Sequence, residues 1–340
     1  MKKKVLHLLG KKIDKGVVLE KPKAKELGHY ATPIAFSLAK ELKKNPMQIA
    51  EQLSKEFEDS IFEKIEPIKG YINFKLSKHF LNEYATDALK KGFEFGRGEN
   101  SETILLEFVS ANPTGPLHIG HARGAINGDA LLKIGRHLGY NITSEYYIND
   151  AGNQIELLGL SIFLAGQESI LKQSIVYPDQ YYRGEYIIEI AYKAGDVFGE
   201  DIFKDSANIP RLSEFGKDLM LEEVKSNLAD LGVVFDNFVS EKSLFCKWSQ
   251  TKESLDKNGA LYVSEGKTWL ASSSHGDEKD RVVIREDGIP TYLAGDIIYH
   301  EDKFKRGFDR YINIWGADHH GYIARVKSAV RYLGYDDHRL

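Results

Sequence analysis

The chain has 340 residues, of which 42% are hydrophobic and 28% are charged. This composition excludes a disordered or fibrous polypeptide and leaves room for two or three folded domains. The net charge of −4, from 46 basic and 50 acidic residues, does not by itself indicate a nucleic-acid partner. The single cysteine, Cys246, excludes internal disulfides, and no apolar run is long enough for a signal-peptide core or a membrane span. We therefore expect a cytoplasmic protein that makes no membrane contact.

The first 98 residues predict a small α+β domain. Helices are expected after Thr32-Pro33, from Asn45-Pro46, where a cap residue precedes proline at the first helical position, and around residues 80–90. Residues 70–76 alternate polar and apolar side chains, which predicts a half-buried strand. The glycines and charges of residues 92–102 indicate a linker.

Lysines are concentrated at the start of this domain. Residues 1–25 contain nine lysines and only two acidic residues, Asp14 and Glu20, so the net charge of this segment is +7. Such a patch would attract a phosphate backbone, although charge alone is equally consistent with an ordinary solvated surface. The lysines are at positions 2, 3, 4, 11, 12, 15, 21, 23 and 25.

From residue 103 the pattern changes to a buried strand, a turn and a helix. Residues 103–109 are a short apolar run, typical of a strand, and a Pro- and Gly-rich turn follows it. At a junction of this kind in a parallel sheet, the free N–H groups of the helix start favour a phosphate. The helix is predicted from apolar residues at three- and four-residue spacing, namely Ile119, Ala122, Ile126, Ala130, Leu131, Ile134 and Leu138.

Two histidines lie at the start of this helix. His118 and His121 are three residues apart, so they share a helix face and can both donate to one polyphosphate. Gly120 between them would let a flat base approach the backbone. An isolated H-x-x-H is more often a pair of ordinary helix-start histidines, and the strand and turn before it favour the phosphate-binding interpretation here.

The rest of the chain continues to alternate strands and helices. A strand at residues 141–148 and a helix from Gln154 predict a doubly wound parallel sheet. Residues from about 165 to 270 are helical and charge-rich, which indicates an insertion. The sheet is expected to resume with strands at 281–284 and 311–316, followed by a helix at 322–333.

These motifs together resemble one enzyme family. The string EFVSANPTGPLHIGH at 107–121 resembles the first signature, HIGH, of class I aminoacyl-tRNA synthetases. Three further segments extend the resemblance: EYYINDAGNQ at 145–154, residues 276–300 and residues 315–329. Together with the HIGH string they are similar to arginyl-tRNA synthetase of the bacterial type. Residues 28–40 and 70–76 resemble the N-terminal appended domain of that family, which contacts tRNA. The resemblance covers essentially the whole chain.

The resemblance implies a domain plan. Residues 1–98 would form the appended domain, and residues 99–340 a Rossmann-like class I catalytic domain. Within the catalytic domain it implies a HIGH half at 103–160, the helical insertion at about 165–270, and an incomplete second half at 271–340. The chain contains no KMSKS-type lysine loop and no anticodon-binding domain. We therefore expect an incomplete, weakly active or inactive fragment that begins at the N-terminus and ends before that loop.

The implied activity is ATP-dependent activation of L-arginine to arginyl-adenylate, followed by transfer to tRNA(Arg). The partners would be tRNA(Arg), L-arginine and ATP with Mg²⁺ on its phosphates, and the protein would be a monomer. His118, His121 and Gly120 would be catalytic and, with Gly316 and Asp318, would bind ATP. The alternative is a non-catalytic, synthetase-derived protein that binds nucleotide or RNA. The HIGH region comprises Ala111, Asn112, Pro113, Thr114, Gly115, Pro116, Leu117, His118, Ile119, Gly120 and His121.

Arginine selectivity places a separate demand on the site. A planar, permanently charged guanidinium must be met by carboxylates. The family's acidic positions correspond to Glu107, Glu241 and Asp296, although without the resemblance each could be a surface salt bridge. Tyr292 would supply a flat wall, and Ser110 and Asn112 would bind the amino and carboxylate ends of arginine.

A protein-bound metal is the weaker interpretation of the histidines. Asp318, His319 and His320, taken with His118 and His121, make up a possible ligand list. No spacing among them matches a known zinc pattern, so we expect no metal held by the protein itself. The roles of His319 and His320 are left open, and the residues of the INDAGNQ loop (148–154) could also be simple turn residues.

Overall fold

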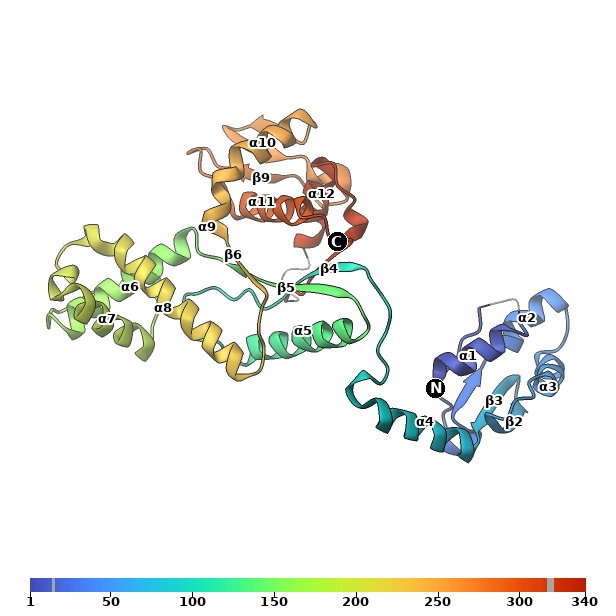
Figure 1. The fold of residues 1–340 in the computed structure, drawn as a ribbon. Helices are drawn as coiled ribbons and strands as arrows, with labels where there is room; N and C mark the ends of the chain where they lie inside the picture. The colour runs from blue at the N-terminus through green and yellow to red at the C-terminus, as the bar shows by residue number, and fades with distance from the viewer. Residues whose placement is uncertain (14–15, 317–320) are drawn as a thin grey trace. The chain divides into compact units, whose positions relative to one another are not determined.

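The computed structural model describes residues 1–13, 16–316 and 321–340. The chain divides into two compact units, residues 1–97 and residues 98–340, and each has a hydrophobic core of its own (Figure 1).

The N-terminal unit is a three-stranded antiparallel sheet with helices. The strand order is β1-β3-β2, with β3 in the centre. Asn45 and Ser77 cap the helices that follow them, because each side chain accepts a hydrogen bond from a backbone N–H of the first turn. The sequence did not predict the first helix or strands β1 and β2. The elements are α1 Lys2–Gly10, β1 Tyr30–Thr32, α2 Ile34–Leu42, α3 Pro46–Glu56, β2 Phe62–Ile68, β3 Tyr71–Leu76 and α4 Lys78–Lys91.

The second unit, residues 98–340, is built on a parallel sheet of four strands in the order β10-β4-β5-β6. The expected parallel α/β architecture is thus present. Its strands are β4 Thr103–Glu107, β5 Asn141–Ile148, β6 Asn237–Ser240 and β10 Arg310–Asn313. Its longer helices are α5 Ile119–His137, α6 Asn153–Ser169, α7 Glu185–Phe198, α8 Ile209–Asp230, α10 Trp248–Lys257, α11 Tyr292–Lys305 and α12 Tyr322–Tyr332.

Helices cover both faces of this sheet (Figure 1). Leu106 on β4 and Phe108 just after it pack with α5 and α8, whereas Leu105 on β4 packs with α11 and α12. On β5, Tyr146 faces α5 and α8, and Tyr147 faces α11. Side chains alternate between faces along a strand, so every second residue of these strands reaches the same layer.

Helix α5 is where we predicted it, but it buries a different face. In the predicted apolar row, Ile119 is 87% exposed and Ile134 is 59% exposed. The buried face carries small residues, because the Phe108 ring occupies the space where a side chain on Gly128 would lie, and Ile142 does the same at Gly135. Close approach of the helix to the sheet therefore selects glycine and alanine, which an apolar pattern overlooks.

The predicted insertion at 165–270 contains helices α7, α8 and α10, but it also contains strands. Helices α7 and α8 form a core together with α6. Strand β6, which we had placed inside the insertion, is the fourth strand of the parallel sheet. The expected strand at 281–284 is present as β9 Arg281–Ile284, but it belongs to a separate antiparallel sheet with β7 Leu261–Ser264 and β8 Lys267–Leu270. Short apolar strands have the same sequence pattern whichever sheet they join, so the sequence could not assign these strands to a sheet.

The remaining elements are short. Helix α9 spans Glu241–Leu244 and directly follows β6. The 3₁₀ helices are Lys25–Leu27, Gly92–Glu94, Glu200–Phe203, Ser206–Asn208, Phe245–Lys247, Ser272–His275 and Asp337–Arg339. Among the described residues, none of the helices combines the length and apolar character that crossing a membrane requires.

Candidate active site

A strained turn follows β4 at the carboxyl edge of the parallel sheet. Val109 and Ser110 have φ angles of 71° and 42°, in the left-handed region that a β-branched residue such as valine rarely adopts. Three hydrogen bonds hold this conformation. The Ser110 hydroxyl donates to Glu107 Oε1 (3.0 Å) and accepts from the Tyr147 N–H (3.1 Å), and the Ser110 carbonyl accepts from Asn149 Nδ2 (3.2 Å). Strain maintained by its surroundings is typical of functional sites.

His118 and His121 begin helix α5 as a reciprocal cap. His118 Nδ1 accepts from the Gly120 N–H (3.1 Å), and His121 Nδ1 accepts from the His118 N–H (3.4 Å). The two rings are stacked, with centroids 3.7 Å apart. A Cβ at Gly120 would lie 2.9 Å from Cε1 of His118, so a larger residue there would disturb the cap.

The cap also fixes the tautomers of the two histidines. Since each Nδ1 accepts a hydrogen bond, the proton of each neutral ring is on Nε2, which remains available as a donor. Burial, followed by the neighbouring His118, lowers the pKa of His121, so this ring is neutral near pH 7. The helix start thus offers the Nε2–H groups of both rings as donors beside its backbone amides.

Two carboxyl groups meet near the start of α11. Glu241 is the first residue of α9, directly after β6, and is buried, with 5% of its surface exposed. Its Oε1 occupies the space where a side chain on Gly295 would lie, and this places it next to Asp296. Desolvation and then the Asp296 charge raise the pKa of Glu241 to about 7. Desolvation and then Glu107 raise the pKa of Asp296 to about 7. Among the described residues, neither carboxyl group has a hydrogen bond or an ion pair.

Glu107 differs from these two carboxylates because it is already paired. Its Oε2 accepts from Lys303 Nζ on α11, and its Oε1 accepts from the Ser110 hydroxyl. Both members of the ion pair are almost fully buried, with side chains 1% and 5% exposed. We expected Glu107 to meet a guanidinium, but its charge is neutralised within the chain. Ser110, expected to contact arginine, likewise uses its hydroxyl inside the turn.

The Glu107–Lys303 pair continues into a buried network. Lys303 Nζ also donates to Asn313 Oδ1 (2.7 Å), and Asn313 Nδ2 lies 2.8 Å from His300 Nε2. His300 Nδ1 lies 2.7 Å from the Asp296 carbonyl, so Nδ1 carries the proton and Nε2 accepts. Burial and then Lys303 lower the pKa of His300 to about 3, so the ring stays neutral. The network joins α11 to β10 and β4 behind the two free carboxyl groups.

The remaining predicted residues lie around this edge of the sheet. Asn112 is exposed, and its Nδ2 donates to Gln154 Oε1 (2.6 Å). Tyr292 is 50% exposed, and its ring would lie 3.5 Å from a Cβ on Gly152 in the 149–154 loop. Asp150 bridges β5 to β6 by accepting from the Ser240 hydroxyl (2.6 Å) and the Lys242 N–H (2.9 Å).

Part of the predicted site lies outside the described residues. Gly316 follows β10 and is exposed, but Asp318, His319 and His320 are not described. Within the described residues, Asp336, Asp337 and His338 form a cluster of side chains of the kinds that bind metal ions. This cluster is far from the HIGH turn in the sequence. Asp337 there already accepts from Arg331 Nε (2.6 Å).

Sequence reasoning missed Lys303, His300 and Tyr147. Lys303 lies seven residues, about two turns, after Asp296 on α11. That spacing places both residues on one helix face. It is the one signal that could have indicated a buried counter-ion.

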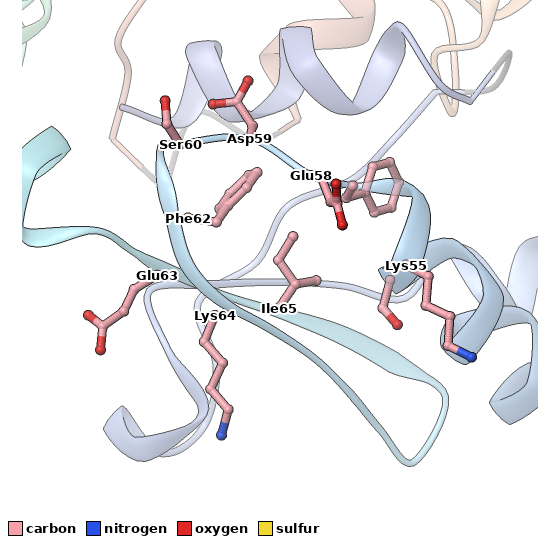
Figure 2. A pocket seen from close by; sticks show the side chains of 10 residues that line it. Lys55, Glu58, Asp59, Ser60, Phe62, Glu63, Lys64 and Ile65 are labelled. Atoms are coloured by element: carbon pink, nitrogen blue, oxygen red, sulfur yellow. The ribbon is translucent and has the colours of Figure 1, made fainter.

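A groove in the N-terminal unit has a different chemical character (Figure 2). It has a volume of about 570 Å³ and lies along α3 and β2. Its charged side chains are Glu58, Asp59 and Glu63 against Lys55 and Lys64. With acidic groups in excess, the groove is not suited to a phosphate, so it is not the candidate active site.

The comparisons with known proteins agree with the geometry. A family model described as "tRNA synthetases class I (R), catalytic domain" matches residues 85–340, and one described as "Arginyl tRNA synthetase N terminal domain" matches residues 2–76. The arginine–tRNA ligase of a Nitratiruptor species is 63% identical over 341 residues, covering 100% of this chain and 64% of its own length. That of Wolinella succinogenes is 62% identical and covers 99% of this chain and 64% of its own length.

A solved structure supports the fold. The arginyl-tRNA synthetase of Thermus thermophilus aligns with a TM-score of 0.66 at 20% identity, covering 98% of this chain and 62% of the other. The chain thus spans just under two thirds of the length of the proteins that it resembles, at 64% of both curated relatives. The resemblance seen in the sequence is confirmed. The chain belongs to the arginyl-tRNA synthetase family of class I.

Proposed function

We propose that this chain carries the arginine-activating site of an arginine–tRNA ligase. The observation that supports the proposal most strongly is the pair of carboxyl groups, Glu241 and Asp296, at the carboxyl edge of the parallel sheet, neither of which has a partner within the described residues. Two neighbouring carboxyl groups with pKa values of about 7 repel each other when both are ionised, and a cation entering between them relieves that cost. A guanidinium is the cation whose planar donors fit two carboxylates.

The chemistry requires positioning more than proton transfer. A carboxylate oxygen of arginine would attack the α-phosphorus of ATP, and the bond from that phosphorus to the oxygen of the leaving pyrophosphate would break. Charge then spreads over phosphate oxygens, which the Nε2–H groups of His118 and His121 and the first amides of α5 could stabilise. Mg²⁺ would arrive on the ATP phosphates and neutralise part of their charge.

Other predicted residues would hold the substrates. We assign the half-exposed Tyr292 ring to the wall of the arginine pocket, and the Asn112 amide to the amino or carboxylate end of arginine. Gly316 would let the nucleotide approach the end of β10, with Asp318 as the acceptor for a ribose hydroxyl. Because the Ser110 hydroxyl and Glu107 are used internally, we assign them to positioning the turn rather than to binding.

The second half of the proposed reaction is transfer of the arginyl group to tRNA(Arg). The N-terminal unit would contribute RNA contacts, because Lys2, Lys3, Lys4, Lys11 and Lys12 are all exposed. Exchanging these lysines for glutamate should weaken tRNA binding and flatten its dependence on salt, as measured by filter binding at several salt concentrations. Unchanged affinity and an unchanged salt slope would contradict an RNA role for this surface.

The arginine pocket is tested by Asp296→Asn. Removing one charge from a guanidinium pocket should weaken arginine binding by about 2 to 5 kcal/mol while ATP binding stays unchanged, as measured by calorimetry. The matched control is Asp302→Asn on the same helix, where the carboxylate accepts from Lys247 Nζ (2.7 Å) instead. Equal losses of arginine and ATP affinity in Asp296→Asn, or a loss of arginine affinity in the control, would contradict the pocket assignment.

A further inference from the structure

The Tyr147 hydroxyl has no hydrogen-bond partner among the described residues, although it is buried. Tyr147 is 5% exposed, and its oxygen is without solvent contact. Two neighbouring buried tyrosines differ in this respect. Tyr146 donates to the Ala111 carbonyl (2.8 Å), and Tyr299 donates to Glu145 Oε1 (2.9 Å). A buried hydroxyl without a partner costs about 1 to 3 kcal/mol, so its presence needs a reason.

The Tyr147 ring is held firmly in place. It stacks on the Tyr299 ring of α11, with centroids 4.1 Å apart and planes 18° apart. Its backbone N–H donates to the Ser110 hydroxyl (3.1 Å), which ties it to the strained turn after β4. The hydroxyl is therefore a fixed group rather than a freely rotating side chain.

The surroundings of this hydroxyl are acidic. Tyr147 lies on the face of β5 that α11 covers, and Asp296 is three residues, nearly one helical turn, before its stacking partner Tyr299. Burial, and then the charges of Glu241, Asp296, Glu107 and Asp150, raise the pKa of Tyr147 far above its ordinary value. The phenol therefore keeps its proton throughout the physiological range.

Of these four carboxylates, two are engaged elsewhere. Glu107 is paired with Lys303, and Asp150 accepts from Ser240 and Lys242. Glu241 and Asp296 have no hydrogen-bond or ion-pair partner in the part of the chain that the structure describes. The Tyr147 hydroxyl is thus a neutral, rigid and unsatisfied group beside the two carboxyl groups of the proposed arginine pocket.

We propose that the Tyr147 hydroxyl is a specificity-determining contact for the guanidinium group of the substrate, accepting one of its N–H groups while Glu241 and Asp296 supply the charge. This inference rests on the proposed function. A guanidinium has five N–H donors in a fixed plane, more than two carboxylates need, whereas the ammonium of lysine has three on a compact group. A fixed neutral acceptor therefore strengthens the binding of a guanidinium more than the binding of an ammonium.

The test is Tyr147→Phe, which keeps the stacked ring and removes only the oxygen. We expect the dissociation constant for L-arginine to rise at least tenfold, and the preference for L-arginine over L-lysine to fall, while ATP affinity is unchanged, all by calorimetry. The melting temperature without ligand should stay the same or rise, because the variant removes an unsatisfied buried group. A hydroxyl with a structural hydrogen bond would give the opposite shift.

The control is Tyr311→Phe, another buried tyrosine of the same sheet, whose hydroxyl donates to the Phe304 carbonyl (3.4 Å). Its arginine affinity should stay within twofold of the unmodified chain. If the unmodified chain binds no arginine, the proposed function itself is wrong. If it binds arginine and Tyr147→Phe binds equally well with the same preference over lysine, only the present inference is overturned. A lowered melting temperature with equal losses of arginine and ATP affinity would overturn it as well.

Discussion

Lys303 and Glu107 form a buried ion pair that joins helix α11 to the end of strand β4 across 196 residues of sequence. Each member of the pair has a further hydrogen-bond partner within the protein: Asn313 Oδ1 accepts from Lys303, and the Ser110 hydroxyl donates to Glu107. This arrangement supports the turn that leads to His118. Because Glu107 is already paired with Lys303, it is not one of the carboxyl groups that we expect to bind a substrate cation.

Replacing one partner of this pair should be strongly destabilising. Lys303→Met leaves Glu107 buried and unpaired, which should lower the free energy of unfolding by about 3 to 5 kcal/mol in urea titrations. The double variant Lys303→Met with Glu107→Gln should recover part of the loss. The control is Lys252→Met, which breaks an exposed pair with Asp256 and should cost about 1 kcal/mol or less. Equal effects for the buried and exposed lysines would contradict the structural role of Lys303.

Two glycines of helix α5 should respond in opposite directions to alanine. Gly128→Ala places a methyl group where the Phe108 ring lies, and overpacking of this kind should cost about 1 to 3 kcal/mol. Gly124→Ala meets no atom within 4 Å, so its better helix propensity should stabilise the chain by up to about 1 kcal/mol. Thermal or urea unfolding measures both. Stabilisation by Gly128→Ala would mean that α5 does not pack on the sheet through this face.

Arginine binding should strengthen as the pH rises through neutrality. Glu241 and Asp296, whose pKa values are raised to about 7, must lose their protons to pair with a guanidinium. Each protonated carboxyl should therefore weaken binding by up to about tenfold per pH unit below 7. Calorimetry between pH 5.5 and 8 measures this change. Affinity that is independent of pH would show that these groups do not contact the guanidinium.

The same groups should affect stability in the opposite direction. Their folded-state pKa values exceed the ordinary values of 4.5 and 3.8, so between pH 4 and 7 the folded chain binds more protons than the unfolded chain. The stability that they contribute is fully present below about pH 4 and is lost as the pH rises through 7. Without arginine, the Glu241→Gln and Asp296→Asn double variant should show a smaller fall in melting temperature from pH 5 to 8 than the unmodified chain does.

The two histidines should affect the rate more than binding. His118→Ala or His121→Ala should lower arginine-dependent ATP–pyrophosphate exchange, assayed with tRNA present, by at least about tenfold, because the lost donors act on charge that develops in the transition state. Arginine affinity should change little. If both variants lost arginine binding as severely as rate, the histidines would have to be reassigned to the amino-acid pocket.

What the sequence determined is local. The HIGH turn, the helix after it, the cap at Asn45 and the alternation of strands and helices all follow from residues within about ten positions of each other. Dihedral preferences and hydrogen bonds over such short spans depend little on the rest of the chain. The family resemblance, which rests on ordered motifs of this kind, could also be stated before any fold was known.

What only the tertiary structure decided is which groups are free. Sequence placed Glu107, Glu241 and Asp296 together as acidic residues, but only packing shows that Lys303 neutralises Glu107 and leaves the other two without partners among the described residues. Packing also turned the glycine face of α5 toward the sheet and placed β6 within it. These outcomes depend on contacts between segments far apart in the chain, where burial changes the energy of a charge by more than any local preference does.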